Sequence, residues 1–238
     1  MATVNASRVA LSPALCKGNT NITSMDLKNT PFISNCMHKA FYGCTALTSV
    51  TNINQNITDM SSAFTGCNHL TSAPTLPPKV KTLGGTMYKD TLNIGGAFAN
   101  TAITAAPTIP STVTNMLGTF VNCTALTSAG TIPLGVADMR FCYSGCNHMT
   151  TAPTIPSSVT DVQNTYAGCT ALTGDVMIMS SIITNATNCF AGTSATKNVY
   201  IPFTYTNNAY TATYNSFIAA GYSTSGGQHG VTLKNLNG

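Results

Sequence analysis

Hydrophobic and polar positions along this chain follow a pattern that returns at a nearly constant interval. Its clearest marker is a buried-type aromatic side chain, found at Phe41, Phe64, Phe98, Phe120, Tyr143, Tyr166 and Phe190. Successive aromatic positions are separated by 23, 34, 22, 23, 23 and 24 residues. A fixed period of roughly 20–50 residues predicts stacked repeats, because each repeat can bury its apolar face only against its neighbours.

Further positions keep a constant phase relative to the aromatic one. A cysteine follows three positions after most aromatics, with Thr101 and Thr193 in the same place elsewhere: Cys44, Cys67, Cys123, Cys146 and Cys169. Four aliphatic sets come next: Leu47, Leu70, Ile103, Leu126, Met149, Leu172; Ile53, Leu76, Ile109, Ile132, Ile155, Ile178; Ile57, Val80, Val113, Val136, Val159, Ile183; and Met60, Leu83, Met116, Met139, Val162. We therefore expect one continuous core shared by all the coils.

Within a repeat, the pattern predicts an extended segment and a helical turn. "LTSAPTLP" (70–77) favours a short strand that its proline ends or borders, because proline cannot donate a hydrogen bond to a ladder. In "SSVTDVQNTYAGC", apolar spacings of three and four indicate one or two helical turns. Asp59, Asp138 and Asp161 precede the apolar residue of that turn. We interpret them as N-caps and not as catalytic or metal-binding groups.

The interval between Phe64 and Phe98 is longer than all the others. It equals one period plus eleven further positions, and "LGGTMYKDTLN" (83–93) is followed directly by the similar "IGGAFANTAIT" (94–104). The sequence therefore predicts an eleven-residue insertion near 83–104.

The order aromatic-x-x-Cys-x-x-Leu-Thr-Ser, then "IP", a valine, an aliphatic residue and a new aromatic resembles the BspA-type leucine-rich repeat of bacterial surface proteins. The likeness covers about residues 33–203 and departs from the family in the insertion and in one extra residue before the "IP". It implies a right-handed solenoid of about six 23-residue coils, with short parallel strands and short helical turns, used for adhesion and not catalysis.

The two ends differ from the repeats. We predict an N-terminal cap over 1–36, a repeat solenoid over 37–203 and an α/β C-terminal cap over 204–238. After Phe190 the pattern changes: "KNVYIPF" (197–203) favours a last strand of the solenoid, "GVTLKNL" favours a final strand of the cap, and Tyr210, Tyr214, Phe217 and Ile218 suit an amphipathic helix stopped by Gly221. This tail resembles closing segments of such repeats in bacteriophage and prophage structural proteins.

Composition narrows the class of protein. Charged residues make up 7% of the chain, and its net charge of +4 comes from scattered lysines without a basic stripe, so we expect no nucleic-acid partner. No apolar run is long enough for a membrane span. The first residues are too weakly patterned for a secretory signal, which leads us to expect an unprocessed protein with reduced cysteines.

The residues best suited to chemistry have structural explanations. We interpret the cysteines as small buried hydrophobes, with disulfides or a metal as open alternatives. His69 and His148 occupy the same position of different coils and cannot share one metal, so we expect turn residues. The chain lacks GxSxG, GK[ST] and HExxH motifs, and no catalytic residue, metal or cofactor is expected.

Two sets of threonines recur at a constant phase and are the candidate ligand-binding residues. The first set is Thr75, Thr108, Thr131 and Thr154; the second is Thr71, Thr104, Thr127 and Thr150, with Thr48 and Thr173 at its ends. Threonine forms strands well and solubilises a surface of low charge, so the sets could be structural only. The alternative is a hydroxyl-rich face that binds a glycan or a protein; an ice-binding ladder is a minor possibility.

These observations favour a non-enzymatic structural or attachment protein of a bacteriophage virion, either fibre or decoration. Its expected partners are a host cell-surface glycan or protein and other virion proteins, with a homo-oligomer left open. The alternative is a bacterial cell-surface adhesin, located outside the cell. An enzyme is the third and weakest hypothesis.

Overall fold

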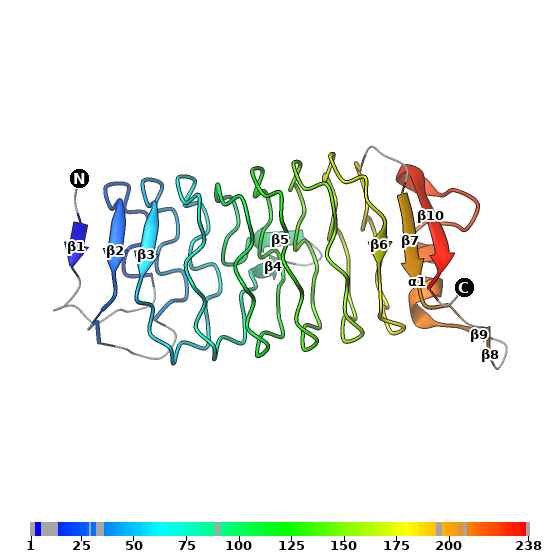
Figure 1. Cartoon of the computed structure of the whole chain (residues 1–238), viewed down its shortest axis with the longest axis horizontal. Helices are drawn as coiled ribbons and strands as arrows, with labels where there is room; N and C mark the ends of the chain where they lie inside the picture. Colours follow the sequence, from blue (N-terminus) through cyan, green and yellow to red (C-terminus); the bar gives the residue numbers. More distant parts are fainter. Residues whose placement is uncertain are drawn as a thin grey trace.

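The computed structural model describes residues 3–5, 14–28, 30–31, 36–88, 91–193, 197–203, 205–206 and 209–236. Successive coils lie side by side along the long axis, with β1 (Thr3–Asn5) at one end and β10 (Val231–Asn235) at the other (Figure 1). We number coils by the residue at the aromatic position. Coils 1 to 8 carry Cys16, Phe41, Phe64, Phe98, Phe120, Tyr143, Tyr166 and Phe190 in that order.

A single hydrophobic core runs through the stack. The apolar positions that the repeat identified are buried, and they join one continuous cluster with residues of the C-terminal segment. The rings from Phe41 to Phe190 stack on one another with centroids 5.4–5.8 Å apart and interplanar angles of 2–15°. Each ring pair adds about 0.5–1.5 kcal/mol beyond its buried area. The predicted core is confirmed.

The segment that carries the aromatic residue was predicted to be helical, and this prediction is wrong. In coil 6 the amides of Met139, Phe141 and Tyr143 donate to carbonyls of coil 7, whereas the amides between them close turns within coil 6. Phe141 has a left-handed backbone, with φ of 56°. A helix needs every amide to bond four residues back and a right-handed backbone throughout, so this alternation excludes it.

The left-handed position two residues after the aromatic repeats in every coil from 2 to 8. It is filled only by glycine or asparagine, the residues that tolerate this backbone best: Gly43, Gly66, Asn100, Asn122, Gly145, Gly168 and Gly192. The local sequence therefore encodes the turn, although the hydrophobic spacing alone favoured a helix.

The aspartates interpreted as helix caps do cap backbone amides, but they cap turns. Asp59 Oδ1 accepts from the Ser61 amide at 2.8 Å, and Asp161 Oδ1 accepts from the Gln163 amide at 2.9 Å. The same position forms a continuous run of parallel bridges across coils 3 to 8: Asp59, Thr82, Asn115, Asp138, Asp161 and Asn185. Short polar side chains satisfy the turn while their backbones link the coils.

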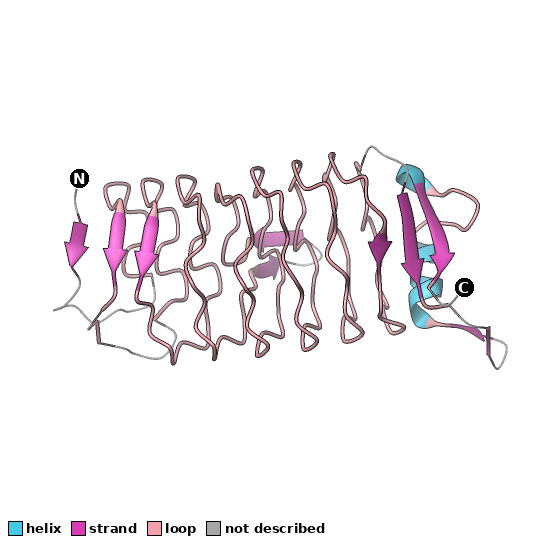
Figure 2. Ribbon diagram, in the orientation of Figure 1, coloured by secondary structure: helices cyan, strands magenta, loops and turns pink. Residues whose placement is uncertain are grey.

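Parallel strands occur only at the two ends of the stack within the described residues (Figure 2). At one end β1 pairs with β2 (Ser24–Asp26), and β2 pairs with β3 (Ser49–Thr51). At the other end β6 (Val176–Met177) pairs with β7 (Lys197–Ile201), and β7 pairs with β10. The predicted parallel strands are confirmed for these coils.

The same face of coils 3 to 6, all of it described, carries isolated bridges but no strand. Eight of the chain's 11 prolines fall there: Pro74, Pro77, Pro78, Pro107, Pro110, Pro133, Pro153 and Pro156. Proline has no amide proton, so it interrupts a central ladder. The predicted "TIP" strands are wrong for these coils, and each "IP" proline instead accepts a turn bond from the valine three residues on.

The insertion forms an antiparallel hairpin of β4 (Thr86–Tyr88) and β5 (Thr91–Ile94), beside coils 4 and 5. The Leu92 side chain lies over the α-carbon of Gly118, which has a left-handed backbone with φ of 58°. Beside it, Leu117 and Val121 are buried. Coil 6 has Arg140 and Ser144 at the corresponding positions, so coil 5 is apolar where the hairpin covers it.

The C-terminal segment closes the stack. Helix α1 (Ala212–Ala219) begins at Thr211, whose hydroxyl accepts from the Tyr214 amide, and the chain turns at Gly221. Phe217 and Tyr222 pack on Phe190 at interplanar angles of 37° and 84°, so the parallel ring stack ends there. The strands β7 and β10 are confirmed, and so is the helix, except that Tyr210 lies before it in a short strand and Ile218 is exposed. A two-stranded sheet of β8 (Tyr205–Thr206) and β9 (Ala209–Tyr210) and a 3-10 turn at Gln228–Gly230 complete the segment.

The N-terminal segment includes one more coil. In coil 1, Cys16 stands where the other coils have a ring, and Ile22 and Met25 are buried beneath coil 2. A small thiol therefore takes the place of the ring in coil 1, and the ring stack begins with Phe41 of coil 2. The division of the chain into cap, repeat and cap stays a prediction.

Candidate ligand-binding face

The first threonine set lies on the surface with its hydroxyl groups available. Thr75, Thr108, Thr131 and Thr154 are all exposed. Within the described part of the chain, no hydrogen bond is formed by any of these four hydroxyls. The four hydroxyl groups are therefore accessible hydrogen-bond donors and acceptors at the same position of coils 3 to 6.

The second set is exposed as well but takes part in holding the coils together. The Thr127 amide and hydroxyl both donate to the carbonyl of Thr104, at 2.9 and 3.1 Å. The Thr104 amide in turn donates to the carbonyl of Thr71 at 3.3 Å. This set has a structural role along part of its length, so the first set is the better candidate for binding. Both assignments remain predictions.

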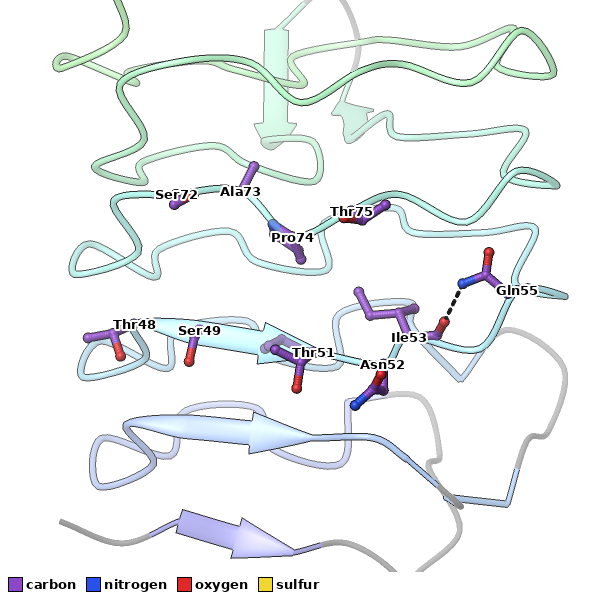
Figure 3. A pocket seen from close by; sticks show the side chains of 11 residues that line it. Thr48, Ser49, Thr51, Asn52, Ile53, Gln55, Ser72, Ala73, Pro74 and Thr75 are labelled. Carbon is purple, nitrogen blue, oxygen red and sulfur yellow. Dashed lines mark hydrogen bonds between the residues drawn. The ribbon is translucent and has the colours of Figure 1, made fainter.

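The face between the two sets is hollowed where strands are missing. One hollow of about 440 Å³ lies between β3 of coil 2 and residues 72–75 of coil 3 (Figure 3). It is lined by Thr48, Asn52, Gln55 and Thr75 among others, and Gln55 Nε2 donates to the Ile53 carbonyl at 2.9 Å. Its walls are thus rich in amides and hydroxyls.

A second hollow of about 570 Å³ lies between coils 5 and 6 and has a different character. It contains Thr131 and Thr154 from the first threonine set, but apolar residues supply five of its nine lining residues, namely Ile132, Leu134, Pro153, Pro156 and Met179. The Leu134 side chain is 78% exposed and Met179 is 48% exposed. A smaller hollow of about 300 Å³ adjoins it and includes Thr127.

The middle of the stack is almost without charge. Residues 91–174 contain only three Asp, Glu, Lys or Arg side chains: Asp138, Arg140 and Asp161. Arg140 pairs with Asp138 at 2.7 Å and lies 3.9 Å from an Asp161 oxygen. Partial burial raises the pKa of Asp161, although the Gln163 amide and Arg140 oppose this. These charges are paired among themselves and none lines the two hollows of coils 5 and 6.

The cysteines are buried thiols that also donate hydrogen bonds. In five coils the Sγ donates to the carbonyl at the aromatic position of the preceding coil, at 2.8–3.1 Å: Cys44 to Cys16, Cys67 to Phe41, Cys123 to Phe98, Cys146 to Phe120 and Cys169 to Tyr143. All nine are unbridged. The interpretation as small buried residues is confirmed, and the structure adds a bond between coils that the spacing did not reveal.

Burial makes these thiols poor nucleophiles. Desolvation raises the pKa of Cys44 and Cys123 to about 11 and that of Cys67 and Cys169 to about 12. A thiolate is the reactive species, so a raised pKa lowers reactivity at neutral pH. The cysteine ladder is structural.

His69 and His148 act as turn residues that connect coils. In each, Nδ1 lies 2.6 Å from a carbonyl oxygen of the preceding coil, that of Thr45 and of Thr124 respectively. Because a carbonyl only accepts, Nδ1 carries the proton. The residues that the structure describes include no group of three or more His, Cys, Asp or Glu suited to a metal, and no helix of the length and apolarity that a membrane span requires.

Two buried polar groups are not apparent from the sequence. Lys197 is 4% exposed, and its Nζ donates to Thr193 Oγ1 at 3.0 Å, while burial lowers its pKa. The Tyr166 hydroxyl is buried and has no hydrogen-bond partner among the described residues, whereas the hydroxyl of Tyr143 donates to the Ala129 carbonyl at 3.3 Å. Lys197 lies in "KNVYIPF", where only the alternation of buried positions could have indicated an inward lysine.

The fold and its surface define a repeat protein in which similar coils share one core and present one exposed polar face. The family model described as "BspA type Leucine rich repeat region" matches residues 14–97 and 95–218, with six copies. The chain therefore belongs to the BspA-type leucine-rich repeat family. Comparison with curated proteins and with solved structures gives no match.

Proposed function

We propose that the chain is a non-enzymatic attachment protein of a bacteriophage virion, a fibre or decoration protein that binds a host cell-surface glycan or protein. Its coils form a solenoid, an architecture that presents an extended surface for binding. The observation that carries the proposal is the first threonine set, with four exposed hydroxyls at one position of coils 3 to 6 and no partners within the described chain.

The structure and the family both support binding over catalysis. The thiols are buried, His69 and His148 bond to backbone carbonyls, and the three charges of the middle are paired with one another. The family consists of leucine-rich repeats, and stacked repeats of this kind form extended surfaces suited to binding. The virion location rests on the likeness of the tail to closing segments in phage structural proteins. In a virion the chain would also contact other virion proteins. The second candidate function is a bacterial surface adhesin.

The attachment role is tested by placing charges on the face. Replacing the first threonine set with lysine should abolish binding of the purified protein to host cells while circular dichroism stays unchanged, because exposed substitutions move stability by only about 0.5 kcal/mol each. A matched control places four lysines at exposed turn positions away from the face: Asn68, Thr124, Asn147 and Thr170. Equal binding by parent and face variant would contradict the proposal.

The location is tested separately. Mass spectrometry of purified phage particles should detect peptides of this chain in the stoichiometry of a structural protein. Peptides found instead on the surface of intact bacterial cells, and not in particles, would favour the adhesin.

A further inference from the structure

The hollow between coils 5 and 6 has the size and shape of a small-ligand site. Its volume of about 570 Å³ lies within the range of about 300–1,000 Å³ typical of such sites. Coil 5 contributes residues 130–132 and Leu134, coil 6 contributes Pro153, Thr154, Pro156 and Ser157, and Met179 of coil 7 adds to the wall. Three successive coils thus form one concave surface.

Two exposed apolar side chains at this hollow have no role in the core. Leu134 follows the "IP" proline, and the same position holds Ser111 in coil 4 and Ser157 in coil 6. The repeat therefore does not require an apolar residue there, yet Leu134 is 78% exposed and lines the same hollow as Met179, which is 48% exposed. Large apolar side chains grouped at a surface hollow indicate a contact surface.

Polar groups of fixed position lie beside these apolar ones. The hydroxyls of Thr131 and Thr154 have no partner in the described chain, and neither do the backbone amides of Thr131, Ile132 and Thr154. The prolines of coils 5 and 6 prevent the strand ladder that would otherwise use these amides. The wall of the hollow thus combines hydrogen-bond donors and acceptors with methyl, methylene and pyrrolidine groups.

This combination matches one class of ligand. A sugar ring carries hydroxyl groups at its edge and C–H groups on its face, so it can use both kinds of wall at once. No charged side chain lines the hollow, and the only three in residues 91–174 are paired with one another elsewhere. An acidic or sulfated sugar would lose its hydration without gaining a counter-charge.

We propose that the hollow between coils 5 and 6 binds one residue of an uncharged saccharide, with Leu134 and Met179 against the C–H face of the ring and Thr131 and Thr154 bonded to its hydroxyls. This inference rests on the proposed attachment function and names the chemistry of its ligand. The hollow between coils 2 and 3 has Asn52 and Gln55 in its wall, and its large apolar residues Val50 and Ile53 are buried, so it lacks exposed apolar side chains comparable to Leu134 and Met179 (Figure 3).

Ligand-observed NMR with saturation transfer from the full chain tests the proposal directly. The probes are the methyl glycosides of glucose, galactose, rhamnose and N-acetylglucosamine, and the charged comparison is N-acetylneuraminic acid. At least one neutral glycoside should show transfer. The Leu134→Asp variant should bind it at least about tenfold more weakly, since a carboxylate would then be desolvated against the ring. Ser111→Asp adds the same charge at the same position of coil 4 and should bind within about twofold of the parent.

Three outcomes would overturn the proposal: no transfer from any neutral glycoside, equal transfer from N-acetylneuraminic acid, or equal weakening by Leu134→Asp and Ser111→Asp. Folding of both variants is checked by circular dichroism, and both positions are exposed, so the fold should persist.

A second measurement separates this inference from the attachment function. Host cells are treated either with periodate, which cleaves vicinal diols of glycans, or with protease, before the purified protein is added. Loss of attachment after periodate alone supports the saccharide. Loss after protease alone leaves the attachment function intact and overturns the saccharide in favour of a protein partner. Absence of attachment to untreated cells contradicts the attachment function, while the glycoside result still decides the inference.

Discussion

The ends and the middle of the stack hold their coils together by different means. In coils 1, 2, 7 and 8 the exposed face forms parallel strands, and the core lies beneath a regular ladder. In coils 3 to 6 the same face has prolines and almost no ladder, and the coils are joined by the ring stack, by the alternating bonds of the aromatic turn and by the Asp and Asn bridges. The stack thus stays together without backbone hydrogen bonds on one face, because the other face and the core provide the contacts between coils.

This difference bears on function. A ladder uses its amides and carbonyls internally, so the end faces have little left to offer a ligand. The middle face leaves amides and threonine hydroxyls without partners in the described chain, and the hollows with Thr75, Thr131 or Thr154 in their walls border it. The prolines weaken the ladder where the surface is most suited to binding.

The largest contrast should appear in hydrogen exchange. The Ile178 amide donates to the Tyr200 carbonyl at 2.9 Å within the end sheet, whereas the amides of Thr131 and Thr154 form no bond within the described chain. The free energy of the opening that allows exchange should approach the global free energy of unfolding for the Ile178 amide. For the two threonine amides it should be near zero. NMR of the exchanging protein measures the difference, and comparable protection at the three sites would show that a ladder exists in the middle after all.

The next effect is expected from the ring stack. Phe120→Ala removes two ring contacts, at 5.7 and 5.4 Å, from coils that lack a ladder on the opposite face, and should cost about 3–5 kcal/mol. Thr131→Ala on the exposed face of the same coil should cost under about 0.5 kcal/mol. Urea denaturation measures the free energy of unfolding of both variants. Similar decreases would mean that the buried and exposed positions of the repeat are assigned wrongly.

The thiols predict a dependence on pH. The folded protein binds their protons more tightly than the unfolded chain, where the thiol pKa is about 8.5. The contribution of the thiols to stability should therefore be constant below about pH 8 and fall as pH rises toward the folded values near 11 and 12. Each thiol should contribute roughly 1 kcal/mol per pH unit in this range.

Cys123→Thr provides the control for this pH effect, because Thr101 and Thr193 fill the same position in other coils. Urea titrations under reducing conditions at pH 7.5 and pH 10 give the free energy of unfolding. Between these two pH values it should fall less for Cys123→Thr than for the parent. Identical slopes would contradict a titrating thiol core.

The smallest effect concerns two tyrosines in adjacent coils. Tyr166→Phe removes a buried hydroxyl without a partner in the described chain and should stabilise the protein by about 1 kcal/mol, whereas Tyr143→Phe removes the donor to Ala129 and should cost about 1 kcal/mol. Thermal unfolding followed by calorimetry gives both signs. Destabilisation by both substitutions would mean that the Tyr166 hydroxyl has a partner in solution.

The sequence by itself determined the repeat, the buried positions and the closing helix. A ring that recurs at a nearly constant interval can be buried only if the coils stack in phase, so the positions of Leu126 and Tyr143 in the core follow from spacing alone. The segment with Phe217 and the stop at Gly221 is local in the same way, because helix periodicity and a glycine end are properties of neighbouring residues.

Only the tertiary structure decided what depends on the distance between coils. The thiol of Cys123 meets the Phe98 carbonyl, Leu92 of the insertion covers Gly118, and Lys197 turns inward to Thr193 because the stack brings these groups together from different parts of the chain. Leu134, Thr154 and Met179 likewise share one hollow only because three coils lie side by side. The period of the hydrophobic pattern determines which face of a coil is buried, whereas contacts between coils are set by packing. The proposed binding surface is formed by residues that only these contacts bring together.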